Sequence, residues 1–372
     1  MKKFEYKNIT GLHLELTNKC NACCAMCSRN FKGKTRSNLQ TAELTLEDCK
    51  KIMNKDFLQQ LKLISLCGVY GDATNATDLI QIIDYIYECN PSVHIDLYTN
   101  GSLHNSEWWT TLAKTIKNGM VVFGIDGIGD NHAIHRMYTD FERIIKNAKT
   151  FINAGGRAQW DYIVFKHNEN QVEEARKLSK ELGFEIFQIK KTSRFFKNLY
   201  EKDPQLDSTL EEYGKHPVYN NKGEIVALLE LPEKKEYRNK SEDIIFNKIK
   251  SFGNLQAYFD KVSVKCQSLE TGGIFISCLG EVFPCCTVYQ QVCYKTINGV
   301  NDESELNEYK YYIKDNLSAF LKPIKEIVEG EFFNNIVNSW QKQTIKDGKC
   351  KSCSRTCGMD YNSHKEQHTV RI

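Results

Sequence analysis

The sequence predicts an α/β protein built on a parallel sheet that is covered by helices. Short apolar runs recur about every 30 residues, and amphipathic segments with helical spacing separate them. The six apolar runs are 12–16, 61–67, 93–98, 120–125, 158–165 and 184–189. Alternation of strand and helix over this length is typical of units in which consecutive strands pair in parallel.

Start and stop signals delimit the predicted helices in order along the chain. Thr77-Asp78 precedes apolar residues at helical spacing in 79–86, and Asn90-Pro91 ends this segment. The next helices are bounded by Ser106-Glu107 with Asn118-Gly119, by Gly155-Gly156, and by Asn168 with Gly183.

Two topologies fit this pattern, because crossovers between parallel strands are right-handed. One is a doubly wound sheet and the other is a full or partial βα barrel. In both, active-site groups lie in the loops after the carboxyl ends of the strands. We therefore expect segments 20–27, 68–72, 99–101 and 126–127 to share one face.

The second half of the chain has a different character. Residues 196–262 are rich in charge and proline and predict a connecting region, with some helix near 243–259. From residue 263 the chain bears cysteines, with a hairpin predicted at 272–284 and a helical segment at about 303–346. The predicted domains are accordingly 1–195, 196–262 and 263–372.

Composition excludes several classes of protein. Of 372 residues, 41% are hydrophobic and 26% charged, which is typical of a globular chain, and the net charge of +3 gives no sign of a nucleic-acid or membrane surface. The N-terminal residues contain no apolar run, so we expect a cytoplasmic protein without a secretory signal. In that compartment thiols stay reduced, and the clustering of the 15 cysteines therefore indicates metal or catalytic sites.

The first cluster is Cys20-Asn21-Ala22-Cys23-Cys24-Ala25-Met26-Cys27, directly after the first predicted strand. Three thiolates in such a loop can each bind one iron of an iron–sulfur cube and leave one iron open to a small molecule. The spacing allows two registers, Cys20/Cys24/Cys27 or Cys20/Cys23/Cys27. A zinc site or simple packing of thiols are the alternatives.

In the first register, Cys20-x3-Cys24-x2-Cys27 resembles the radical S-adenosylmethionine (SAM) superfamily over about residues 12–194. The resemblance implies a partial (βα)6 TIM-like barrel with a [4Fe–4S] cluster on Cys20, Cys24 and Cys27. It also implies that SAM is bound by Met26, Gly71, Asp72, Asn100, Asp126 and Arg136.

The implied roles of these residues follow the family pattern. The 68–72 turn, with Asp72, would hold the methionine ammonium, Arg136 would bind the carboxylate, and Asp126 would accept from a ribose hydroxyl. Two features depart from that pattern: Met26 replaces a frequent aromatic residue, and Val69-Tyr70 separates two glycines that are usually adjacent.

The second group of cysteines is Cys266-x13-Gly280-x4-Cys285 followed by Cys350-x2-Cys353-x3-Cys357. The predicted hairpin brings Cys285 beside Cys266, so four thiolates can meet around a fully ligated cluster, with a structural zinc as the alternative. The pattern resembles the twitch form of the SPASM-type auxiliary domain. This resemblance implies one auxiliary [4Fe–4S] cluster on Cys266, Cys285, Cys350 and Cys353, with Cys357 and Cys286 as alternates.

The resemblance implies an enzyme that cleaves SAM to a 5′-deoxyadenosyl radical, which abstracts hydrogen from a peptide or carbohydrate-like substrate in a net oxidation or other C–H modification. Such an enzyme needs an external one-electron reductant such as flavodoxin or ferredoxin. About a dozen residues precede the first strand, so we expect no leader-peptide domain there. Candidate substrate contacts are Trp160, Asp161, Tyr162, Lys166, Lys190 and Arg194. A non-enzymatic iron–sulfur electron carrier is the alternative function, and the sequence does not identify catalytic residues.

Overall fold

The computed structural model describes residues 2–196, 214–298, 316–358 and 368–371. These residues form two compact units, each assembled from separate stretches of the chain. Unit 1 comprises 1–19, 37–96 and 248–362, and unit 2 comprises 20–36, 97–247 and 363–372. The boundary falls inside strand β5 (His94–Thr99). The domain limits expected at residues 195 and 262 stay predictions.

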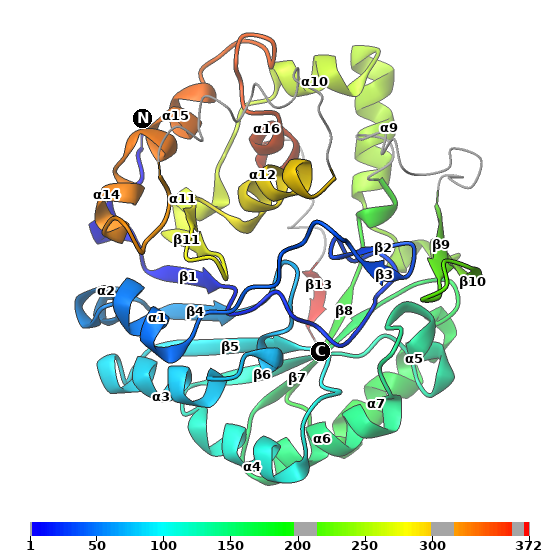
Figure 1. Ribbon diagram of the computed structural model, residues 1–372. Coiled ribbons are helices and arrows are strands. Elements are labelled where there is room, and N and C mark those ends of the chain that lie inside the picture. The colour runs from blue at the N-terminus through cyan, green and yellow to red at the C-terminus, as the bar shows by residue number, and fades with distance from the viewer. Residues whose placement is uncertain (1, 197–213, 299–315, 359–367, 372) are drawn as a thin grey trace. The chain divides into compact units, whose positions relative to one another are not determined.

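Unit 1 contains a sheet whose strands follow the hydrogen-bonded order β12-β11-β1-β4-β5 (Figure 1). Its strands are β1 (Gly11–Leu14), β4 (Leu63–Leu66), β11 (Gly273–Ile276) and β12 (Val282–Phe283), with the start of β5. β1 pairs in parallel with β4 on one side and with β11 on the other, where Gly11 is opposite Gly273. The predicted hairpin of the cysteine module is therefore present, and it extends the sheet beside the first strand.

The helices of unit 1 begin and end at the signals that the sequence contains. For example, the Thr45 and Asp48 side chains form a capping box on α1, and Asn90 ends α3. The helical elements are η1 (Tyr6–Asn8), α1 (Leu46–Ile52), α2 (Lys55–Gln60), η2 (Ala73–Asn75), α3 (Leu79–Cys89), α10 (Leu255–Lys261), α11 (Gln267–Thr271), α12 (Cys286–Asn298), α14 (Ile324–Val328), α15 (Glu331–Ser339) and α16 (Lys351–Cys357). α9 (Ser241–Phe252) begins in unit 2 and ends in unit 1.

Unit 2 contains the strand order β5-β6-β7-β8-β13. β6 (Gly119–Gly124), β7 (Ala158–Ile163) and β8 (Ile186–Lys190) are parallel, and β13 (His368–Arg371) is antiparallel to β8. Two hairpins lie outside this sheet: β2 (Asn30–Phe31) with β3 (Lys34–Thr35), and β9 (Lys215–Tyr219) with β10 (Ile225–Glu230).

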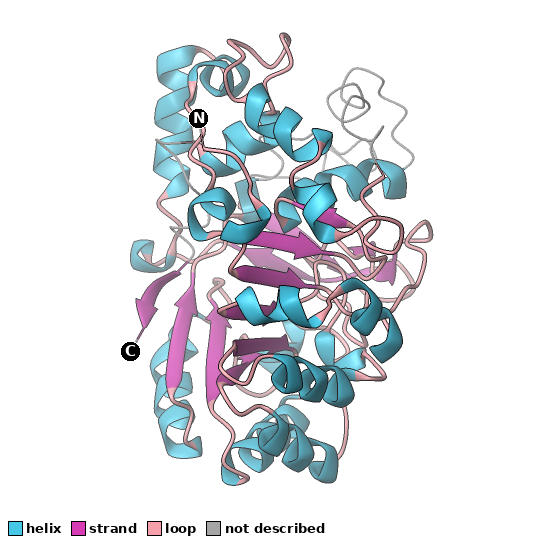
Figure 2. Ribbon diagram, turned by 90° about the vertical axis from the view of Figure 1, so that its left-hand side faces the viewer, coloured by secondary structure: helices cyan, strands magenta, loops and turns pink. Residues whose placement is uncertain are grey.

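The helices of unit 2 cover one face of these strands (Figure 2). Phe123 of β6 contacts Trp109 of α4 and Phe151 of α6, with ring centroids 5.4 and 6.2 Å apart. Burial of these large side chains stabilises the helix–sheet contact. The helical elements are α4 (Ser106–Thr115), α5 (Asp130–His135), α6 (Phe141–Asn153), η3 (Glu169–Gln171), α7 (Val172–Leu182), η4 (Arg194–Phe196) and η5 (Lys235–Tyr237).

The predicted α/β fold with a mostly parallel sheet is confirmed. All six apolar runs contain strands, namely β1 and β4–β8, and α9 and α10 account for the helix expected near 243–259. The helical segment expected at 303–346 is present as α14 and α15, while its part at 303–315 lies outside the described residues. The β9–β10 hairpin falls in the region interpreted as a connection, where weak periodicity concealed it. Within the described ranges, no helix has both the length and the apolar character that crossing a membrane requires.

Asn168, which is fully buried, joins the carboxyl ends of β6 and β7. Its Nδ2 donates to the carbonyls of Asp126 (2.9 Å) and Ile163 (3.0 Å), and its Oδ1 accepts from the Phe165 N–H (2.7 Å). We expect Asn168→Ala to lower the free energy of unfolding by about 3 kcal/mol, because three buried backbone groups lose their partner. Denaturant titration checks this against Asn153→Ala, a change at the exposed end of α6. Equal stability of the two variants would contradict it.

Candidate functional site

Backbone hydrogen bonds hold the first cysteine loop in place. In unit 2 the Cys23 N–H donates to the Met137 carbonyl (3.0 Å) and the Ala25 N–H to the His135 carbonyl (3.2 Å), so the loop is attached to the end of α5. The Cys27 N–H donates to the Cys24 carbonyl (3.1 Å), which turns the chain. The Cys27 thiol is close enough to Cys24 to contribute to the raised pKa of Cys24.

Asn100, which follows β5, contacts the same loop. Its Nδ2 lies 3.8 Å from the Cys20 sulfur and 3.0 Å from the Asn21 Oδ1. Its Oδ1 accepts from the Ser102 N–H (2.9 Å) and hydroxyl (2.5 Å), which orients the amide. The structure therefore places the predicted residue Asn100 against the first cysteine.

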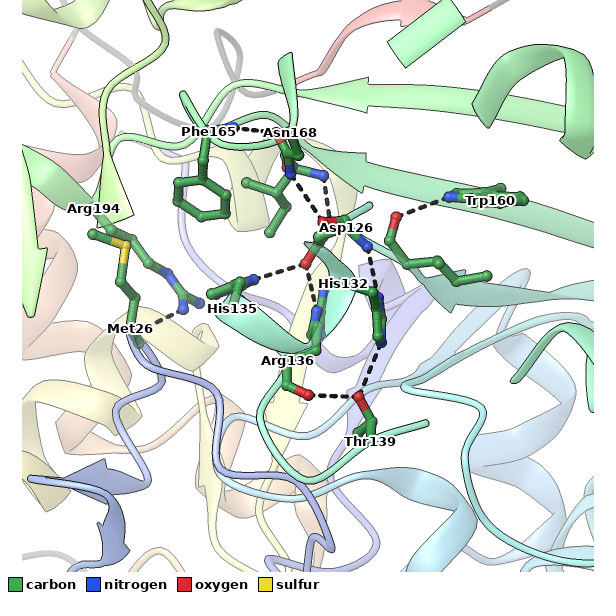
Figure 3. Close-up of polar contacts among 12 residues, drawn as sticks. Met26, Asp126, His132, His135, Arg136, Thr139, Trp160, Phe165, Asn168 and Arg194 are labelled. Atoms are coloured by element: carbon green, nitrogen blue, oxygen red, sulfur yellow. Dashed lines mark hydrogen bonds and ion pairs between the residues drawn. The ribbon is translucent and has the colours of Figure 1, made fainter. Parts of the chain in front are cut away.

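A buried carboxylate organises the end of β6. Asp126 is fully buried, and its Oδ2 accepts from Arg136 Nε (2.5 Å) and His135 Nδ1 (2.8 Å), while its Oδ1 accepts from the Ile163 N–H (2.7 Å) (Figure 3). Burial alone would raise the pKa of Asp126, but the charge of Arg136 and the His135 hydrogen bond hold it well below its usual range. Both oxygens thus bind groups of the protein.

His132 and His135 hold α5 in place. His132 Nδ1 accepts from the Asp126 N–H (3.1 Å), so its Nε2 carries the proton and donates to the Thr139 hydroxyl (2.9 Å), which donates to the Arg136 carbonyl (2.6 Å) (Figure 3). Burial lowers the pKa of each histidine to about 4. Both imidazoles are therefore neutral at physiological pH and fix the segment that carries Arg136.

Arg136 connects this carboxylate to the cysteine loop. Its guanidinium also bonds the Cys24 thiol, and burial raises the pKa of that thiol to about 11 although Arg136 opposes the rise. Gly124 makes room for the guanidinium, because a Cβ on Gly124 would lie 2.7 Å from Arg136 Nη2. The predicted residues Cys24, Asp126 and Arg136 therefore lie together.

The Met26 side chain packs against a cluster of apolar residues outside the cysteine loop. Its side chain contacts a core formed by Phe165, Phe195, Val218 and Leu229, the last two from the β9–β10 hairpin. Its carbonyl accepts from Arg194 Nη1 (2.8 Å), and the Ala25 carbonyl is 3.0 Å from His216 Nε2. The hairpin that the sequence did not reveal thus covers the cysteine loop.

A second ion pair occupies the sheet face that carries Gly124. Asp161 is directly opposite Gly124 in the β6–β7 register, so its side chain shares that face with the Arg136 guanidinium. Asp161 pairs with Lys190 and accepts from Gln159 Nε2 (2.6 Å), and the Lys190 ammonium lies 5.7 Å from the Tyr98 ring centroid. The side chain of Lys190 is 23% exposed and that of Asp161 is 6% exposed, so Lys190 is the accessible partner.

The glycine turn after β4 belongs to unit 1 and is tightly packed. A Cβ on Gly68 would lie 2.1 Å from the Gly71 carbonyl oxygen, and one on Gly71 would lie 1.8 Å from the Thr17 carbonyl oxygen. The Asp72 N–H donates to the Lys19 carbonyl (2.9 Å). Asp72 Oδ1 accepts from the Thr74 N–H (3.0 Å) and hydroxyl (2.7 Å), so the predicted carboxylate also caps η2.

Glu15, which no sequence motif indicated, contacts this turn from the end of β1. Its carboxylate is fully buried, and Oε1 accepts from the N–H groups of Tyr70 (2.7 Å) and Gly71 (3.2 Å). Burial raises its pKa to about 7 although these backbone groups oppose the rise. The only sequence signal was an acidic residue within an apolar run.

Five cysteines of unit 1 lie on or directly before the three helices α11, α12 and α16. Cys266 precedes α11, Cys285 precedes α12, and Cys350 precedes α16, which carries Cys353 and Cys357. Neighbouring thiols of this group contribute to the raised pKa values of Cys266, Cys285, Cys353 and Cys357, and the Cys350 and Cys353 thiols are hydrogen-bonded. Backbone N–H groups in the first turns of α11 and α12 bond the Cys266 and Cys285 sulfurs, as suits anionic ligands.

The two alternates differ in position. Cys357 joins the group, whereas Cys286 is near both Cys285 and Cys67 of the β4 end. Among the described residues no three His, Cys, Asp or Glu side chains lie close enough to hold one metal ion. A cubane cluster requires wider spacing, because each thiolate binds a different iron.

Comparison with known proteins identifies a domain in the N-terminal half of the chain. The model described as "Radical SAM superfamily" matches residues 14–179, and no curated protein matches the chain. The crystal structure of Streptococcus suis SuiB is similar with a TM-score of 0.55 at 15% identity, over 90% of this chain and 69% of that chain. SuiB bound to the precursor peptide SuiA gives 0.54 at 14%, over 93% and 76% of the respective chains.

A third structure is similar over nearly the whole of both chains. It is anSMEcpe with bound AdoMet (S-adenosylmethionine), with a TM-score of 0.53 at 16% identity over 96% of this chain and 92% of that chain. At these identities the likeness concerns the fold. The match at residues 14–179, which include the cysteine loop described above, shows that this part of the chain is a domain of the radical SAM superfamily.

Proposed function

We propose that this enzyme binds a [4Fe–4S] cluster through Cys20, Cys24 and Cys27 and binds SAM beside it. The observation that carries the proposal is the loop itself, whose backbone is hydrogen-bonded to the end of α5 while Asn100 and Arg136 contact its first and second ligand cysteines. With SAM and the cluster bound, the site supplies a 5′-deoxyadenosyl radical that abstracts hydrogen from an unactivated C–H bond.

Within this site, Arg136 is the residue that binds the carboxylate of SAM. Asp126 holds the guanidinium through Nε and so leaves the Nη groups to face the loop. Asp126 acts as a positioning residue here, because both of its oxygens bind protein groups; its contact with the ribose stays a prediction. Met26 contributes apolar surface, and the turn with Gly71 and Asp72 takes the amino group of SAM.

A peptide is the substrate that the comparisons support, because SuiB was solved with its precursor peptide. The strand face beside Arg136 limits the chemistry of the substrate, because it carries Asp161, Lys190 and Gln159. The part of the substrate that contacts this face is therefore polar. Lys190, the accessible member, donates to an oxygen of the substrate. This polar face also suits a carbohydrate-like alcohol, which is the second candidate.

The five-cysteine group holds one auxiliary [4Fe–4S] cluster, with Cys266, Cys285, Cys350 and Cys353 as ligands and Cys357 as the alternate that the packing favours. Bound by these thiolates, such a cluster would supply an electron acceptor, which would favour a net oxidation of the substrate. An external one-electron reductant such as flavodoxin or ferredoxin supplies electrons to the first cluster. An iron–sulfur electron carrier would bind the same iron and leave SAM intact.

The ligand register is tested by substitution of adjacent cysteines. After anaerobic reconstitution with iron and sulfide and reduction with dithionite, we expect the parent and Cys23→Ala to convert SAM to 5′-deoxyadenosine. We expect Cys24→Ala to form none, because one iron loses its thiolate. Mass spectrometry of 5′-deoxyadenosine is the measurement. Product from Cys24→Ala but not from Cys23→Ala would reverse the register, and none from the parent would favour the electron carrier.

The auxiliary cluster is tested by counting iron. Two cubane clusters predict about eight irons per chain, and we expect Cys285→Ala to retain about four. Cys286→Ala is the matched control and keeps the full number, because Cys286 lies toward Cys67. Iron and zinc are quantified by plasma mass spectrometry. One zinc per chain that is lost in Cys285→Ala would establish the zinc site instead.

The space beside Gly124 tests the role of Arg136. Gly124→Ala places a methyl carbon 2.7 Å from Arg136 Nη2, so the guanidinium must move while Asp126 stays in the core. We expect the dissociation constant for SAM to rise at least about tenfold, as the loss of one charge-assisted contact implies. Equilibrium dialysis with labelled SAM measures it, and Gly11→Ala, whose Cβ would meet only ordinary contacts, is the control. Unchanged affinity in Gly124→Ala would exclude Arg136 as a SAM ligand.

A further inference from the structure

We propose that Glu15 is a positioning residue for SAM, which holds the Gly68–Asp72 turn in its binding conformation. This inference rests on the proposed function, because the turn matters to the reaction only if SAM binds there. Glu15 is not a ligand in this account, since its carboxylate is enclosed by protein. It acts through the backbone of the turn.

Glu15, Thr17 and Lys19 all contact the Gly68–Asp72 turn, and we call this set of contacts the clamp. Oε1 of Glu15 accepts from two consecutive N–H groups, those of Tyr70 and Gly71. The segment that follows Glu15 touches the same turn: the Thr17 carbonyl packs against Gly71, and the Lys19 carbonyl accepts from the Asp72 N–H. Consecutive N–H groups directed at one anion form a nest, which suits a carboxylate.

The position of this segment makes the clamp relevant to the cluster. Lys19 directly precedes Cys20, so residues that hold the turn continue into the loop of cluster ligands. Any shift of the turn changes where its carbonyls and Asp72 face. A substitution at Glu15 should therefore change SAM affinity while all proposed cluster and SAM ligands remain in the chain.

The ionisation of Glu15 should make the strength of the clamp depend on pH. Its second oxygen, Oε2, is buried and has no hydrogen-bond partner among the residues that the structure describes, and burial raises the pKa of the carboxyl to about 7. The titratable residues on the segments that contact each other here are His13, whose pKa is lowered by burial and whose Nε2 is 2.6 Å from the Cys67 carbonyl, and Tyr70 and Asp72 of the turn, while Lys19 pairs with Glu43. None of them acts as a counter-ion to Glu15, because burial and backbone N–H groups account for its shift.

The sign of the pH effect follows from the hydrogen bonds. A carboxylate accepts N–H bonds more strongly than a neutral carboxyl does, so the ionised form holds the turn better. Ionised Glu15 predominates above about pH 7. The affinity for SAM should accordingly rise with pH between 6 and 8, and SAM should stabilise the ionised form.

The test compares two variants of the full, anaerobically reconstituted chain. Glu15→Gln keeps a neutral acceptor for the Tyr70 and Gly71 N–H groups, whereas Glu15→Leu removes it. With labelled SAM as the probe in equilibrium dialysis, the dissociation constant of the parent should fall about fivefold from pH 6 to pH 8. Glu15→Gln should show no such dependence and should match the parent at low pH, and Glu15→Leu should bind at least about tenfold more weakly.

Controls separate this inference from the proposed function. Glu47→Gln, an exposed change on α1, should retain the behaviour of the parent, and iron content verifies that each variant holds its clusters. A parent that binds no SAM overturns the proposed function. A parent that binds SAM while Glu15→Gln has the same pH dependence, or Glu15→Leu the same affinity, overturns the role of Glu15.

A second measurement uses only the parent protein, so it tests the role of Glu15 even if the variants do not fold. At pH 6.5 the parent should lose infrared absorption from a protonated carboxyl when SAM is added, because binding favours ionised Glu15. Absence of that difference signal, in protein shown by dialysis to be saturated with SAM, would overturn the proposal.

Discussion

The buried carboxylate of Asp126 is the point on which the arrangement of unit 2 depends. It joins the end of β6 to β7 through the Ile163 N–H and to α5 through His135 and Arg136. A charge buried this deeply is tolerated only with partners that offset the loss of water, and Arg136 is the main one. Because Arg136 also bonds Cys24, the partners of this one carboxylate help to position the first cysteine loop.

Sequence periodicity predicted the sheet well because strand and helix leave different repeats in the pattern of apolar residues. The six strands and the hairpin at β11–β12 were all expected. The β9–β10 hairpin was not, because Ile225, Val226 and Leu228 are exposed and leave no alternation of buried and polar positions. Local patterns also cannot reveal that β11 joins β1, since that pairing depends on contacts between distant parts of the chain.

In the candidate site, too, the sequence predicted the features that leave a local pattern and missed those that depend on contacts between distant residues. Cysteine spacing identified both groups of thiols, because a cluster needs several ligands of one kind and spacing is visible in sequence. Asn100, Asp126 and Arg136 lie near the first loop as expected. Glu15 could not be found this way: its importance arises from burial and from a turn that is more than fifty residues away, and neither leaves a local signal.

The pairing of β1 with β11 constrains how the protein is made. The first strand obtains its second neighbour from Gly273–Ile276, about 260 residues further along the chain. During synthesis the ribosome must therefore release most of the polypeptide before β1 is covered on both sides, and contacts of such high sequence separation form slowly. Until then the edge of β1 is open to other chains, a hazard for aggregation in a nascent protein.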